Sequence, residues 1–199
     1  METLQALKEY KRRHVEAAEK WEDDGEGGSS LTEEERDFAR NPDPPRKYIW
    51  KKGTKDELKL GTWVSHQRSN KKNGKLSENR IASLQALTPP LVWDPTEAAF
   101  QTGLQALKEY KRRHVEALEK ERGEGGGGGE GGSSLTEEER DFARNPDPPQ
   151  RYIWKKGTMD ELNLGSWVNS QRKNKKNGTL SEDQIAALEA LTPALVWAP

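Results

Sequence analysis

Apolar residues recur at helical spacing along most of the chain. In the first twenty residues, good helix formers separate the apolar positions Leu4, Leu7, Val15 and Ala18. This pattern predicts a helix from Met1 to about Trp21. His14 lies in the same stripe, and His114 takes its place in a second copy of the segment. We interpret both histidines as core residues whose ring nitrogens are hydrogen-bonded.

Capping motifs predict the next elements. Ser30-Leu31-Thr32-Glu33 has the spacing of a capping box, so we expect a short helix through about Arg40. Leu31 and Phe38 are its apolar positions. The prolines of Asn41–Pro45 then end the helix and impose extended geometry.

Thr54-Lys55-Asp56-Glu57 also has capping-box spacing and predicts a longer helix from about Lys55 to Asn73. The apolar face of this helix consists of Leu60, Trp63 and Val64. Gly61 would permit the close approach of a neighbouring segment. Gly74 follows the last helical residue, the position that favours glycine.

A further short helix is expected after Ser77, continuing to about Leu87. At the equivalent place later in the chain, Ser181-Glu182-Asp183-Gln184 completes a capping box. Prolines at positions 89 and 90 end the helix, and Leu91-Val92-Trp93 returns apolar side chains to the bundle.

The segment Leu60–Trp93 occurs again as Leu164–Trp197, so the chain consists of two tandem copies of one module. We predict an all-α fold of two small helical bundles: copy 1 spans residues 1–94 and copy 2 spans residues 95–199. Asp94-Pro95-Thr96-Glu97 has favourable residues for a helix N-terminus, so the first helix of copy 2 is expected to begin there.

Composition supports small domains with flexible loops. Of 199 residues, 31% are hydrophobic and 34% are charged, which is low in apolar content for one large core. Acidic, glycine-rich stretches at residues 22–30 and 122–134 predict flexible loops. The absence of cysteine excludes disulfides and thiolate chemistry. Without a signal peptide or a long apolar run, an intracellular location, nuclear or cytoplasmic, is expected.

The formal net charge is −1, but the charges are segregated. Lysine and arginine collect near the end of the helix predicted over residues 55–73 and at its counterpart in copy 2, spaced so that several share one side of the helix. Such a line of cations can follow phosphates, and a neighbouring glutamine can contact a base edge or a sugar. The candidate nucleic-acid-binding residues are Gln67, Arg68, Lys71, Lys72, Lys75, Gln171, Arg172, Lys173, Lys175 and Lys176. Alternatively, these cations offset the helix dipole and solvate the surface.

The tryptophans admit two interpretations. They could stack on bases, but the surrounding leucine, valine and isoleucine residues favour core packing for Trp63, Trp93, Trp167 and Trp197. Trp50 and Trp154 are also expected in the core, with a solvent-facing aromatic strip as the alternative because lysines flank them. His66 has Ser170 as its counterpart, which argues against a shared metal or catalytic role.

Several motifs in fixed order resemble the helicase-associated domain family. They are LG-x-WV-x-x-QR, a basic stretch, Gly-x-Leu-Ser-Glu, and Ile-x-x-Leu-x-x-Leu before a terminal Val-Trp. The resemblance is tightest over Leu60–Trp93 and Leu164–Trp197 and looser over Phe100–His114. It implies an all-helical fold and nucleic-acid binding. The ATPase motor of a helicase is missing, since no GxxxxGK[ST] motif is present.

The sequence therefore predicts a non-enzymatic nucleic-acid-binding accessory module that needs no cofactor or metal. Its expected partners are DNA or RNA, with a helicase or another protein as a further possibility, and no membrane. The alternative is a protein-protein interaction module whose cations serve solubility. An enzyme would need a site assembled from ordinary aspartate, glutamate and histidine residues.

Overall fold

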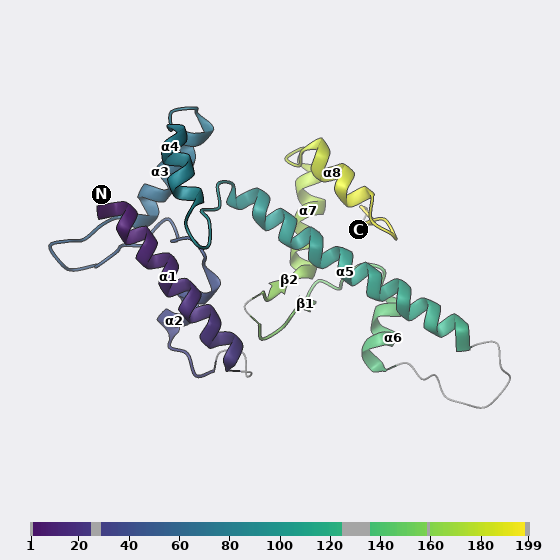
Figure 1. The fold of residues 1–199 in the computed structure, drawn as a ribbon. Coiled ribbons are helices and arrows are strands. Elements are labelled where there is room, and N and C mark those ends of the chain that lie inside the picture. Colours follow the sequence, from purple (N-terminus) through teal and green to yellow (C-terminus); the bar gives the residue numbers. More distant parts are fainter. Residues whose placement is uncertain (1, 25–28, 125–135, 159, 198–199) are drawn as a thin grey trace. The chain divides into compact units, whose positions relative to one another are not determined.

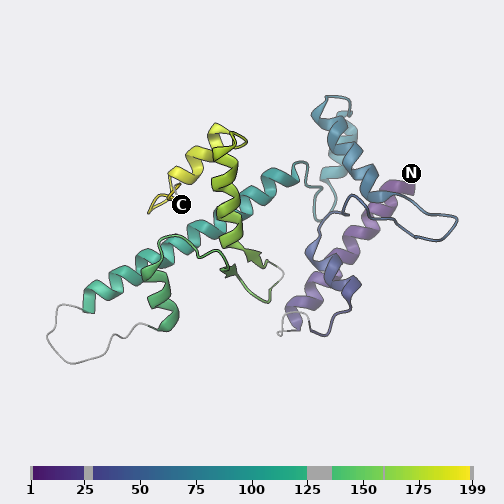
Figure 2. The same cartoon turned by 180° about the vertical axis from the view of Figure 1, so that it is seen from behind.

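The computed structural model describes residues 2–24, 29–124, 136–158 and 160–197. Its elements in chain order are α1 (Glu2–Asp23), α2 (Glu33–Arg40), α3 (Leu60–Lys72), α4 (Glu78–Gln85), α5 (Pro95–Glu124), α6 (Glu137–Arg144), β1 (Ile153–Trp154), β2 (Leu162–Asn163), α7 (Leu164–Lys176) and α8 (Glu182–Glu189). They form two compact units whose boundary lies in the first turn of α5 (Figures 1 and 2). The predicted all-helical architecture is confirmed, with a minimal two-stranded sheet added. The predicted glycine-rich loops lie largely outside the described residues.

In copy 1, α1 packs against α2 and α3 (Figure 1). Tyr10, Phe38 and Tyr48 form an aromatic cluster with ring centroids 5.0 to 6.1 Å apart. Around it lie the fully buried side chains of Leu7, Leu60, Val64 and Leu84. The predicted positions Leu7, Phe38, Leu60 and Val64 are therefore buried in one small core, whereas the predicted positions Leu4, Val15 and Ala18 of α1 are only half-buried.

Copy 2 repeats this core. Tyr110, Phe142 and Tyr152 form the equivalent aromatic cluster, with centroids 5.0 to 6.1 Å apart. The fully buried aliphatic residues are Leu107, Leu164, Val168 and Leu188. The first helix of this copy begins at Pro95, as predicted, and the N–H of Thr96 donates to the Asp94 carboxylate at 3.0 Å.

The segment before α3 differs from the prediction. The helix begins only at Leu60, because the Glu57 carboxylate accepts a hydrogen bond from the N–H of Gly53 at 2.9 Å instead of capping a helix. Gly53 has a φ of +82°, which turns the chain back so that Leu58 pairs with Trp50. The equivalent turn in copy 2 is flanked by β1 and β2, which pair antiparallel.

The capping predictions have mixed outcomes. The α2 box is formed by Thr32 and Glu35, two residues later than predicted, with Thr32 Oγ1 accepting from the Glu35 N–H at 3.2 Å. Ser77 is the N-cap of α4, although its side chain makes no capping bond. The capping box of Ser181 and Gln184 is confirmed.

The glycine predictions for α3 are confirmed. A Cβ on Gly61 would lie 1.8 Å from the carbonyl oxygen of Pro45, and the same conflict, at 1.9 Å, exists between Gly165 and Pro149. The proline-rich segment can therefore cross directly over the first turn of α3 and of α7. Gly74 ends its helix with a φ of +64°.

Candidate nucleic-acid interface

One exposed cationic surface of each copy lies where α3 or α7 ends. Lys72 and Lys75 are exposed in copy 1, as are Lys173 and Lys176 in copy 2. Within the described parts of the chain, none of these four lysines forms an ion pair. Their ammonium groups are therefore free to meet an anion from solution.

Lys71 and Lys175 lie on tryptophan rings instead. The Lys71 Nζ is 4.3 Å from the centroid of Trp93, and the Lys175 Nζ is 3.9 Å from that of Trp197. Both lysines are half-buried. A cation over an indole face is attracted by the ring quadrupole, so each tryptophan holds its lysine close to the protein surface.

The Arg68 side chain forms its hydrogen bonds and its ion pair within copy 1. Its Nε donates to the carbonyl of Val92 at 2.7 Å, and its guanidinium forms an ion pair with Asp43 at 2.7 Å. Arg172 makes the same bonds to Val196 and Asp147. These arginines join α3 or α7 to the C-terminal tail of their copy, and only about a fifth of each side chain is exposed.

A second cation on the same carboxylate was missed by the sequence analysis. Lys11 of α1 is only 1% exposed, and its Nζ donates to the Asp43 carboxylate and to the carbonyl of Pro90 at 3.1 Å. Burial lowers the pKa of Lys11, while the hydrogen bond to Asp43 opposes this shift. The N–H of Val92 donates to the same carboxylate at 3.0 Å.

Copy 2 contains the same arrangement. Lys111 is 1% exposed and donates to Asp147 at 2.7 Å. The Val196 N–H donates to this carboxylate at 3.3 Å. We call the set of Asp43 with Lys11, Arg68 and Val92, and its counterpart at Asp147, the carboxylate junction.

The two glutamines lie inside the modules. Gln67 is 9% exposed and Gln171 is 7% exposed. The amide of Gln171 donates to the carbonyl of Trp167 at 3.4 Å. Direct contact with a base edge requires an accessible amide, so the structure supports the lysines of this set more than the glutamines.

The six tryptophans that occur in both copies fall into two groups. Trp50 and Trp154 are buried, each 8% exposed, with an arginine guanidinium about 5 Å above the ring. The predicted core position is thus confirmed and the alternative of a solvent-facing strip is wrong. The other four pack against the core but stay partly exposed: Trp63, Trp93, Trp167 and Trp197.

The predicted hydrogen bonds of the two histidine rings are confirmed, and His114 is buried as predicted, whereas His14 is only half-buried. His14 Nδ1 lies 2.7 Å from the carbonyl of Phe38, and His114 Nδ1 lies 2.6 Å from that of Phe142. Each histidine thus joins the first helix of its copy to the second, which explains its place in the apolar stripe.

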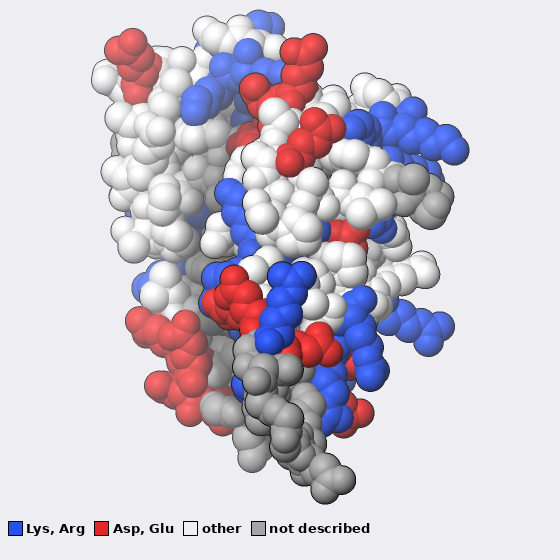
Figure 3. All heavy atoms as spheres, turned by 90° about the vertical axis from the view of Figure 1, so that its right-hand side faces the viewer, with Lys and Arg blue, Asp and Glu red and all other residues white. Residues whose placement is uncertain are grey.

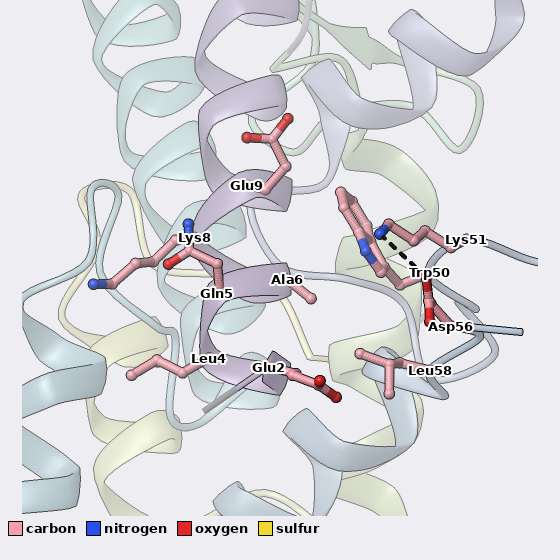
Figure 4. A pocket seen from close by; sticks show the side chains of 10 residues that line it. All are labelled: Glu2, Leu4, Gln5, Ala6, Lys8, Glu9, Trp50, Lys51, Asp56 and Leu58. Atoms are coloured by element: carbon pink, nitrogen blue, oxygen red, sulfur yellow. Dashed lines mark ion pairs between the residues drawn. The ribbon is translucent and has the colours of Figure 1, made fainter.

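A cavity of about 790 Å³ lies beside α1. Figure 4 shows Trp50, Lys51 and Asp56 on one side of α1 and Lys8 on the other. The lining carboxylate of Glu9 has a pKa lowered to about 2, mainly by its hydrogen bond with Arg12. Glu9 therefore stays ionised at neutral pH and is unsuited to donate a proton.

Two kinds of feature are absent from the described residues. They contain no group of histidine, cysteine, aspartate or glutamate residues arranged to hold a metal ion. They also contain no helix whose length and apolar character would suit a bilayer. On the face drawn in Figure 3, cationic and acidic side chains are interspersed, in keeping with the small net charge.

The fold and surface together define a tandem pair of small helical modules with cationic helix ends. The helicase associated domain model matches residues 33–94 and 137–198, and the chain belongs to that family. Neither a curated protein nor a solved structure gives a significant match to the chain. The matched ranges contain α2 to α4 and α6 to α8, and therefore both cationic surfaces.

Proposed function

We propose that this protein is a non-enzymatic nucleic-acid-binding accessory module that contacts phosphates through the cationic ends of α3 and α7. The observation that carries the proposal is the set of exposed lysines without ion pairs at these helix ends, Lys72, Lys75, Lys173 and Lys176. Family membership supports the same role. No catalytic domain is identified alongside the two family modules.

The type of contact follows from the side chains. Lysine ammonium groups are compact charges that attract phosphates without reading a base sequence. Binding is therefore expected to be largely independent of sequence and strongly dependent on salt. Arg68 and Arg172 contribute indirectly, because they fix α3 and α7 to the rest of each module.

The test is fluorescence anisotropy of labelled single- and double-stranded DNA and RNA, measured at about 50 and 200 mM salt. Replacing the four exposed lysines by alanine should weaken binding and reduce the log-log salt slope on duplex DNA by about 0.9 for each lost phosphate contact. The melting temperature should change little, because surface substitutions of this kind seldom exceed about 0.5 kcal/mol each.

A matched control removes the same number of exposed lysines elsewhere. Its positions are Lys8, Lys52, Lys108 and Lys156. This control variant should keep most of the binding. Equal losses in both variants would show that net charge alone determines binding, and no salt-dependent binding by the unmodified protein would support the protein-interaction alternative instead.

A further inference from the structure

The two copies differ only at their surface over the segment that carries the cations. Comparison of Leu60–Trp93 with Leu164–Trp197 shows that every buried position has the same residue in both copies. The differing positions of copy 1 are Thr62, Ser65, His66, Ser69, Lys75, Asn79, Arg80, Ser83, Gln85 and Pro90, all exposed or half-exposed. One buried framework therefore carries two different surfaces.

The differences shift charge in one direction. The copy 1 segment has five lysine or arginine side chains and one carboxylate, whereas the copy 2 segment has four and three. Four substitutions toward copy 2 make its surface more negative: Lys75 to Thr179, Asn79 to Asp183, Arg80 to Gln184 and Gln85 to Glu189. One makes it more positive, Ser69 to Lys173.

One added carboxylate of copy 2, Glu189, lies beside a cation. The Glu189 carboxylate lies 2.7 Å from the Lys175 Nζ, and this hydrogen bond lowers the pKa of Glu189 and keeps it ionised. In copy 1, Lys71 is the equivalent of Lys175, and the uncharged Gln85 is the equivalent of Glu189. Among the described residues, Lys71 forms no ion pair. Thus one candidate cation is neutralised by its own chain in copy 2 but not in copy 1.

The start of α8 differs in the same sense. Gln184 takes part in the capping box and donates to the Glu97 carboxylate at 3.0 Å. Its counterpart Arg80 places a guanidinium 5.2 Å from the ring centroid of Trp63. A cation in copy 1 is thus replaced by an amide beside a carboxylate in copy 2.

We propose that the two copies are unequal, and that the α3–α4 surface of copy 1 forms the main phosphate-binding surface of the protein. Copy 2 keeps the fold but has much of its cationic charge offset by its own carboxylates. The ligand class is a flexible or duplex polyanion with a sugar-phosphate backbone. This inference rests on the proposed function, because it assigns that function mainly to one copy.

The test exchanges surface charge between the copies at exposed positions, and Arg80 and Gln184 are left unchanged. Variant A gives copy 1 the residues of copy 2 through Lys75→Thr, Asn79→Asp and Gln85→Glu. Variant B makes the reverse change through Thr179→Lys, Asp183→Asn and Glu189→Gln. Variant C combines all six substitutions, so that its net charge equals that of the unmodified protein. Each new residue already exists on the same buried framework in the other copy.

Binding to labelled DNA and RNA is measured by anisotropy at about 50 and 200 mM salt, with thermal melting as a check on folding. Variant A should lose at least about tenfold in affinity and show a smaller salt slope. Variant B should gain affinity, and variant C should bind within about threefold of the unmodified protein, because the strong surface has moved to copy 2. Unchanged affinity in variants A and B, with salt-sensitive binding by the unmodified protein, would overturn the inequality alone. The absence of such binding by the unmodified protein would overturn the proposed function instead.

Discussion

Replacing Asp43 by asparagine should strongly destabilise copy 1. The substitution keeps the shape of the side chain but removes the charge that faces Lys11 and Arg68. Lys11 is 1% exposed, so its ammonium group would remain buried with only the Pro90 carbonyl and a neutral amide as partners. Breaking a buried ion pair from one side costs about 3–5 kcal/mol.

The measurement is urea denaturation followed by tryptophan fluorescence. With an m value of about 1–3 kcal/mol/M for a small domain, the midpoint of the copy 1 transition should fall by about 2 M. Asp56→Asn is the matched control, because its ion pair with Lys51 spans 3.9 Å and its side chain is 61% exposed. This control should cost at most about 1 kcal/mol.

A second variant tests the same ion pair if Asp43→Asn alone fails to fold. Adding Lys11→Met to Asp43→Asn removes the buried ammonium group together with its counter-ion, so part of the lost stability should return. Equal costs for Asp43→Asn and Asp56→Asn would refute the reasoning, as would a double variant less stable than Asp43→Asn alone.

Two further predictions concern backbone packing and pH. Gly61→Ala should destabilise copy 1 by about 1–3 kcal/mol in thermal melts, since its Cβ would meet the Pro45 carbonyl at 1.8 Å. Gly74→Ala, in open space but at positive φ, should cost only about 1 kcal/mol. Hydrogen bonds lower the pKa of Glu35 and Glu139 to about 2 from the ordinary 4.5. Their stabilisation is complete above pH 4.5 and lost toward pH 2, so the melting temperature should fall over that range, and a flat profile would contradict this.

The helices could be predicted from the sequence because their signals are local. The signals used were the spacing of apolar residues, the glycine at position 74 and the prolines after α4. Each of them lies in, or within a few residues of, the helix that it defines. The predicted start of α3 was wrong because the sequence from Thr54 to Glu57 is compatible with a capping box and equally with a turn. The turn forms because Trp50 pairs with Leu58. This pairing involves a residue outside the four-residue motif, so the motif alone could not predict it.

The candidate site was predictable only in part. The spacing of Arg68, Lys71, Lys72 and Lys75 places them along one side of a helix and the turn that ends it, but it does not reveal which of them meet the rest of the chain. Arg68 is held by Asp43, which is 25 residues away in sequence. Lys11 lies 32 residues from the same carboxylate, and a lysine is among the residues least expected to be buried.

The carboxylate junction has a consequence for how such chains can grow. Asp43 receives hydrogen bonds from the first helix, from α3 and from the tail at Val92. The first helix and the C-terminal tail of copy 1 are therefore both hydrogen-bonded to Asp43 in the middle of the copy. The next helix begins at Pro95, directly after this tail. A whole module can thus be added or removed at this point without opening the polar interior of its neighbour. By the same logic, a fragment that ends before Val92 would leave the carboxylate and its two cations without the backbone that completes them.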